Sequence, residues 1–149
     1  MTPQEAVQAR QIIGLIVPSI PRNFFNWISV AAWLWLSPDG KGGGGGGQAY
    51  DTLGDATGFT FPIPPLLRPL SILREMHPEV DHRRWQSVLL QFGRSREHVR
   101  LAYAFDDPLR WMITEGNYAS MIRAIRPDFA GLSGPGGGAD DLDTRWLQQ

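Results

Sequence analysis

The chain of 149 residues contains no cysteine. This absence excludes thiol nucleophiles, disulfide frameworks and zinc sites built from thiolates, and it removes any sign of an oxidising compartment. Lysine is nearly absent as well, because Lys41 is the single lysine among 14 basic residues, which face 15 acidic ones. With a net charge of -1, the chain has no bulk attraction to nucleic acid or to an anionic lipid surface.

Long hydrophobic runs are missing too. The longest, residues 27–36, is interrupted by Ser29 and falls well short of the ~20 apolar residues that span a bilayer. Residues 1–10 contain Glu5 and no basic cluster, which is not the pattern of a secretory signal. We therefore expect a cytoplasmic protein with no membrane partner.

The composition that remains is that of an ordinary globular domain, with 42% hydrophobic and 19% charged residues. A chain of this length corresponds to one domain and buries roughly 70% of the surface of its unfolded form. It needs no metal or disulfide to supply a core.

Periodicity divides the chain into helices and strands. Thr2, Pro3 and Glu5 form a capping box, and apolar residues at spacings of three and four predict a helix from there to Val17. Six glycines at 42–47 follow a Pro-Asp-Gly turn and predict a loop over residues 37–47. We expect strands at 24–36, 48–61, 84–92 and 98–105, and further helices at 66–76, with a start fixed by Pro69, and at 117–126.

This order predicts an α+β fold. The tight hairpin at 93–97 demands antiparallel pairing, so we expect a four-stranded antiparallel sheet with the N- and C-terminal helices packed on one face. Both faces of the strand at 24–36 are apolar, which indicates a strand that is covered on two sides, or one that is covered on one side and sticky on the other. Residues 1–130 form the single domain, and residues 131–149 form a Gly-rich linker and an acidic tail.

Motifs for catalysis are weak. Lys41 is followed by glycines rather than by Ser or Thr, so the glycine run does not match a phosphate loop. The histidines at 77, 82 and 98, with Glu79 and Asp81, are possible metal ligands, but no metal-site spacing is present and surface histidines are the favoured interpretation. No Gly-x-Ser-x-Gly motif occurs. We expect no enzyme, no cofactor, no metal and no small-molecule substrate.

Two features remain. Asp106-Asp107 precedes Pro108 at a strand end, where the pair either caps a turn or offers an acidic contact to a basic partner. Six tryptophans are present, and binding interfaces favour Trp and Arg. Four of them, Trp27, Trp33, Trp35 and Trp85, fall on predicted strands, where core packing is the alternative.

The stretch from Trp85 to Phe92, with the Tyr-x-Phe-Asp-Asp-Pro strand end at 103–108 and Trp111, resembles the YezG-like immunity proteins. The resemblance is sharp over residues 85–111 and diffuse over 4–126, and the glycine run and tail depart from the family pattern. It implies a small cytoplasmic α+β antitoxin that protects bacteria from polymorphic toxins, and a cognate toxin domain, a nuclease or nucleic-acid deaminase, as a 1:1 partner.

The resemblance implies stoichiometric inhibition and carries no catalytic residue. Basic clefts of toxins that grip nucleic acid attract acidic loops, and aromatic anchors supply buried contact. A chaperone or adaptor for a secreted effector is the alternative function. The candidate toxin-binding residues are Asp106, Asp107, Trp111, Asp140, Asp141, Asp143 and Trp146.

Overall fold

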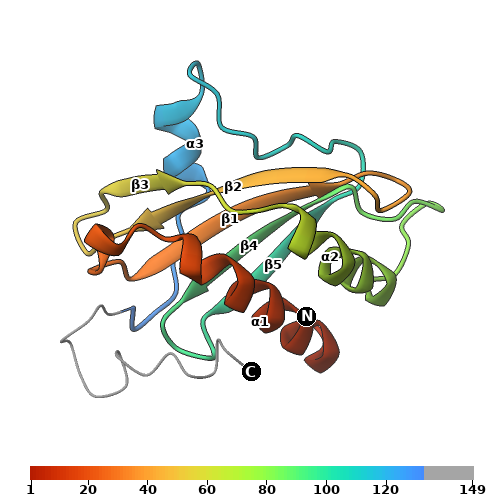
Figure 1. The fold of residues 1–149 in the computed structure, drawn as a ribbon, viewed down its shortest axis with the longest axis horizontal. Coiled ribbons are helices and arrows are strands. Elements are labelled where there is room, and N and C mark those ends of the chain that lie inside the picture. Colours follow the sequence, from red (N-terminus) through yellow and green to blue (C-terminus); the bar gives the residue numbers. More distant parts are fainter. Residues whose placement is uncertain (133–149) are drawn as a thin grey trace.

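The computed structural model describes residues 1–132 and confirms the α+β class (Figure 1). Over these residues the chain forms a five-stranded antiparallel sheet, three α-helices and two short 3-10 helices, Val17–Ser19 and Arg22–Phe24. The strand order is β3-β2-β1-β4-β5. The elements are α1 (Pro3–Ile16), β1 (Ser29–Leu36), β2 (Gly43–Tyr50), β3 (Ala56–Phe59), α2 (Pro64–Met76), β4 (Ser87–Gly93), β5 (Val99–Ala104) and α3 (Tyr118–Ala124).

Helix α1 begins as predicted. The Thr2 hydroxyl accepts a hydrogen bond from the Glu5 N–H at 3.1 Å, and the Glu5 carboxylate accepts one from the Thr2 N–H at 3.3 Å. This reciprocal pair satisfies two N–H groups that the first turn leaves without helical partners. The buried residues of α1 include Ile12, Ile13 and Ile16, so the predicted apolar stripe faces the core.

Helix α2 begins earlier than predicted, at Pro64 rather than near Pro69. Pro64 and Pro65 hold backbone angles suited to a first turn, while Pro69 lies inside the helix and removes one backbone donor. Buried leucines at 66, 70 and 73 offset that loss by packing against the sheet and α1. The Gln8 side-chain amide donates to the Pro69 carbonyl at 2.9 Å and ties α1 to α2.

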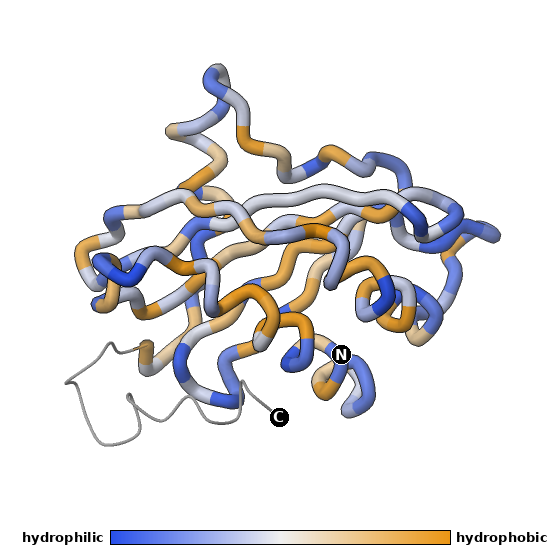
Figure 2. The backbone as a smooth tube through the Cα atoms, viewed as in Figure 1, coloured by the Kyte–Doolittle hydropathy of each residue, from blue (hydrophilic) through white to orange (hydrophobic). Residues whose placement is uncertain are grey.

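The sheet separates two hydrophobic clusters. The larger one lies under α1 and α2 and contains alternate residues of the central strands, such as Val30, Leu34 and Leu90. We call the opposite side the outer face, where a smaller cluster gathers around Ala31, Leu89 and Ile125. Figure 2 shows hydrophobic colour along β1 and β4, whereas the glycine strand β2 is pale.

The prediction of a four-stranded sheet with the terminal helices on one face is wrong in two respects. The region expected as one strand at 48–61 contains the end of β2 and all of β3, which makes five strands. Helix α3 lies across the sheet from α1, because the Tyr50 hydroxyl donates to the Ile122 carbonyl at 2.6 Å on the outer face (Figure 1). A short amphipathic helix does not encode which face of a sheet it covers.

The glycine run is also not a loop. Gly43 to Gly47 belong to β2 and pair with β1, with Gly44 opposite Trp35 and Gly46 opposite Trp33. The indole of Trp35 fills the space that a Cβ at Gly44 would take, and the indole of Trp33 is the nearest side chain to such an atom at Gly46. Cross-strand aromatic cover and ladder hydrogen bonds compensate for the missing side chains of a glycine strand.

Two tryptophans expected on strands lie just outside them. The strand expected from Phe24 starts at Ser29, so Trp27 precedes β1, and Trp85 precedes β4. Both side chains are buried in the larger cluster, as the core interpretation predicts. Trp33 and Trp35 are on β1 but are half-buried on the outer face.

No helix within residues 1–132 is long and apolar enough to cross a membrane.

Candidate functional site

The histidines considered as possible metal ligands lie apart from one another. His82 is exposed in a turn, His98 stacks on Phe129 with ring centroids 5.1 Å apart, and His77 lies at the end of α2. Across residues 1–132, no three side chains of His, Asp or Glu are grouped to hold a metal ion. Lys41 is exposed in the β1–β2 turn, and the glycines after it enter a strand rather than cradle a ligand.

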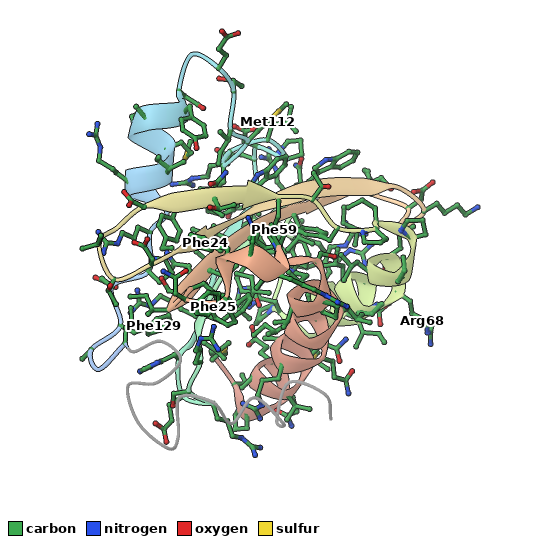
Figure 3. All side chains as sticks on the ribbon, turned by 60° about the vertical axis from the view of Figure 1, so that its left-hand side comes forward. Phe24, Phe25, Phe59, Arg68, Met112 and Phe129 are labelled. Carbon is green, nitrogen blue, oxygen red and sulfur yellow. The ribbon has the colours of Figure 1, made fainter. Side chains whose placement is uncertain are left out.

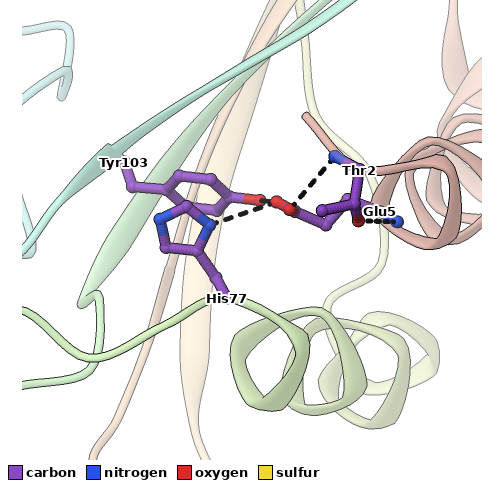
Figure 4. Close-up of polar contacts among 4 residues, drawn as sticks. All are labelled: Thr2, Glu5, His77 and Tyr103. Carbon is purple, nitrogen blue, oxygen red and sulfur yellow. Dashed lines mark hydrogen bonds and ion pairs between the residues drawn. The ribbon is translucent and has the colours of Figure 1, made fainter.

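A buried carboxylate joins three elements (Figure 4). Glu5 is only 3% exposed, and its Oε2 accepts a hydrogen bond from the Tyr103 hydroxyl at 2.6 Å and lies 3.2 Å from His77 Nδ1. The His77 ring packs on Tyr103 at 4.0 Å between centroids. Sequence reasoning found Glu5 only as a helix cap, because the partners are 72 and 98 residues away in the chain.

The electrostatics of this cluster follow from its contacts. Burial alone raises the pKa of Glu5, but the hydrogen bonds from Tyr103, from the Thr2 backbone and from His77 together hold that pKa below its usual value. Burial, followed by the bond to Glu5, raises the pKa of Tyr103 well above the ordinary range. Glu5 is therefore an ionised structural acceptor, with its lone pairs engaged in holding α1 to β5 and to the end of α2.

The outer face offers a more open surface. Paired residues of antiparallel strands point to the same side, so the register places Leu89, Trp33 and Gly46 in one row and Ser87, Trp35 and Gly44 in the next. Helix α3 covers the opposite end, where the Gln91 amide donates to the Ile125 carbonyl at 2.7 Å. The rows that contain the two tryptophans are left partly exposed.

An open groove of about 510 Å³ borders the row of Trp33 and Gly46 and is otherwise walled by β2, by the end of β3 and by Ile113. The buried amide of Gln48 lies in its wall, and the Oε1 of Gln48 has no hydrogen-bond partner within the part of the chain described. Apolar and aromatic walls with a few polar groups are typical of recognition surfaces. The lining residues are Trp33, Gly45, Gly46, Gly47, Gln48, Gly58, Phe59, Thr60 and Ile113.

The segment after β5 crosses this face. The Asp107 carbonyl accepts a hydrogen bond from the Ser87 hydroxyl at 2.9 Å, and its carboxylate accepts one from the Leu109 N–H at 2.9 Å. Asp107 therefore caps a turn, as one of the two predictions states, and both aspartates are exposed. Trp111 is half-buried against the smaller cluster, while Leu109 and Met112 are 48% and 39% exposed.

The structure thus brings three of the predicted contact residues, Asp106, Asp107 and Trp111, onto one segment at the outer face. In Figure 3, Met112 lies on the side of the sheet away from α1 and α2. The other four candidates, Asp140, Asp141, Asp143 and Trp146, lie outside the described residues. Sequence reasoning missed Leu109, Met112 and the groove, since exposure of an apolar side chain depends on the packing around it.

A scan against protein-family models finds no match, and a search of curated proteins finds none either.

Proposed function

We propose that this chain is an immunity protein, which binds a bacterial toxin domain, a nuclease or a nucleic-acid deaminase, and inhibits it stoichiometrically. The observation that carries the proposal is the outer face, where exposed Leu109 and Met112 lie on the segment that also presents Asp106 and Asp107. Apolar patches rimmed by polar residues mark protein-binding surfaces, and we infer that Leu109 and Met112 belong to such a patch. The proposal assigns no catalytic residue to the chain.

In this proposal the groove and the segment after β5 make different contributions to toxin binding. Half-buried Trp33 and Trp111 are held by the sheet and present aromatic area at little entropic cost, which is how interface anchors work. The exposed carboxylates of Asp106 and Asp107 attract a basic toxin cleft and speed association. The tail residues Asp140, Asp141, Asp143 and Trp146 would extend this contact.

The first test is a survival assay. The C-terminal domain of the protein encoded immediately upstream is expressed in bacteria with and without this chain. We expect toxicity alone, rescue on co-expression and a stable 1:1 complex. A harmless upstream product, or one that stays toxic despite good expression of this chain, would contradict the proposal. A complex in which the toxin stays active would support the adaptor function instead.

Matched variants locate the contact. We expect Leu109→Ser with Met112→Ser to weaken the complex at least tenfold, whereas Val7→Ser, an equally exposed apolar residue on α1, leaves it unchanged. Asp106→Asn with Asp107→Asn slows association and reduces its salt dependence, while Glu97→Gln in the β4–β5 turn does not. The amide introduced at position 107 keeps a side-chain oxygen that can cap the turn, so the fold is retained. Equal effects of test and control variants would place the interface elsewhere.

A further inference from the structure

A second cavity, of about 260 Å³, lies beside the end of β1 where α2 and the chain entering β4 meet. Three arginines and a tryptophan supply its polar wall: Arg74 from α2, and Arg83, Arg84 and Trp85 from the segment before β4. Leu36, Pro38 and Gln86 complete the lining, which contains no carboxylate. Three like charges around one small cavity repel one another unless an anion enters it.

Arg74 is the fixed element of this cavity. Its side chain is 4% exposed, and it donates from Nη1 to the Leu36 carbonyl at 3.3 Å and from Nη2 to the Pro38 carbonyl at 3.1 Å. Its Nε–H has no partner within residues 1–132. Two carbonyls orient the guanidinium but do not neutralise it, and a buried charge without a counter-ion is costly.

The charged groups near Arg74 do not offset the free-energy cost of burying its guanidinium. Burial, and next the neighbouring Arg84, lower the pKa of Arg74, while Asp39 and Glu75 oppose that shift from a distance. Asp39 is engaged by the Ser37 hydroxyl at 2.7 Å and the Lys41 N–H at 3.0 Å. Among the described residues, neither acid forms an ion pair with an arginine of the cavity. A guanidinium stays protonated under these conditions, so the positive charge persists.

The position of Arg83 and Arg84 is set by a tight turn. Val80 and Arg83 exchange two backbone hydrogen bonds, of 2.9 and 3.0 Å, around Asp81 and His82. Both central residues have positive φ, 52° and 62°, which non-glycine residues seldom adopt. The turn leads directly into the cavity wall, where the buried Trp85 Nε1–H has no partner in the described part of the chain.

We propose that this cavity binds a phosphate group, either as inorganic phosphate or as the head of a small phosphomonoester. Guanidinium groups match the several oxygens and the double charge of phosphate better than the single charge of a carboxylate. The cavity is smaller than the ~300–1,000 Å³ of sites for drug-sized ligands, which argues against a whole nucleotide. Arg83 and Arg84 are exposed residues of the lining, so their guanidinium groups are accessible to an anion that enters from solvent. This site is independent of the outer face and of toxin binding.

The test is calorimetric titration of the full chain with inorganic phosphate, phenyl phosphate and acetate at constant ionic strength. We expect saturable 1:1 binding of at least one phosphate and at least tenfold weaker binding of acetate. Tighter binding of inorganic phosphate indicates the free ion as ligand, and tighter binding of phenyl phosphate indicates an ester. Absence of phosphate binding, or equal binding of acetate, overturns the proposal.

Variants test the location. Arg83→Gln with Arg84→Gln should weaken phosphate binding at least tenfold, because both side chains are exposed and line the cavity. The control carries Arg22→Gln with Arg68→Gln, which removes the same charge from exposed positions outside the cavity (Figure 3 shows Arg68). It should bind within threefold of the unmodified chain. Equal weakening in both variants would show that net charge, rather than this cavity, attracts the ion.

Discussion

The glycine strand allows a sharp test at two adjacent positions. A Cβ added at Gly47 would lie 2.5 Å from Cζ of Phe59 and 2.7 Å from its Cε1, whereas carbon atoms pack at ~3.5–4.0 Å. Phe59 is only 8% exposed and packs edge-on against Phe61 at 6.1 Å, so its ring has little room to retreat. At Gly46 the nearest atom is Trp33 Nε1 at 3.4 Å, and that indole is half-buried.

Alanine at these two positions should change the free energy of unfolding in different directions. Alanine in place of a strand glycine gains ~0.5–1 kcal/mol through backbone entropy, and overpacking of a core costs ~1–3 kcal/mol. We therefore expect Gly47→Ala to destabilise the protein by about 1–2 kcal/mol and Gly46→Ala to leave it unchanged or to stabilise it by up to ~1 kcal/mol. For a chain of this length the melting temperature should fall by roughly 2–8 °C in the first variant and not in the second.

Urea unfolding followed by tryptophan fluorescence measures both variants, with the slope of the transition checking that the unfolded state is unchanged. A double-mutant cycle then isolates the cause. With Phe59→Leu in place, the ring atoms nearest position 47 are gone, and Gly47→Ala should cost little. Equal stability of the two alanine variants, or no coupling to position 59, would refute the packing of glycines against aromatic rings described above.

Three further predictions concern polar side-chain contacts. The pKa of folded Glu5 lies below its usual value of ~4.3, so its contribution to stability is present above that pH and is lost as the pH falls through the folded pKa. Glu5→Gln should therefore flatten the loss of stability as the pH falls below ~4.3, measured by urea unfolding at each pH, and an unchanged slope would contradict this. The Arg94 guanidinium donates hydrogen bonds to the carbonyls of Trp27 and Phe25, at 2.7 Å each, and lies 4.0 Å from the centre of the Trp27 ring. An ammonium group cannot reproduce this geometry, so Arg94→Lys should lower the free energy of unfolding by ~1.5–3 kcal/mol, measured by thermal unfolding. A change below ~0.5 kcal/mol would count against this. Thr2→Ala should lower the free energy of unfolding by ~1 kcal/mol, and Thr2→Ser should lower it much less, since serine keeps the capping oxygen. The alanine variant should therefore have the lower melting temperature of the two, and the reverse order would contradict the role of Thr2 as a cap.

Local pattern accounts for the elements that the sequence predicts well. The capping box at Thr2 and Glu5 and the stripe through Ile16 suffice to define α1, because each contact joins residues three or four apart. The alternation in β4 and β5, with a short connection between them, likewise predicts their antiparallel pairing. Both faces of β1 are apolar, and the sequence leaves open full cover of both faces or cover of one face with a sticky second face; the structure packs both faces but leaves Trp33 and Trp35 half-buried on the outer one.

Only the tertiary structure decides the remainder. Nothing in a run of glycines favours a strand, and β2 exists because β1 supplies a hydrogen-bond ladder and the indoles of Trp33 and Trp35 cover the bare backbone. Helix α3 is held on the outer face by the hydrogen bond from the Tyr50 hydroxyl to the Ile122 carbonyl, and these two residues are 72 positions apart in the chain. The groove and the arginine cavity arise in the same way, since each is walled by elements far apart in the chain, and long-range packing is a property of the whole fold rather than of any segment.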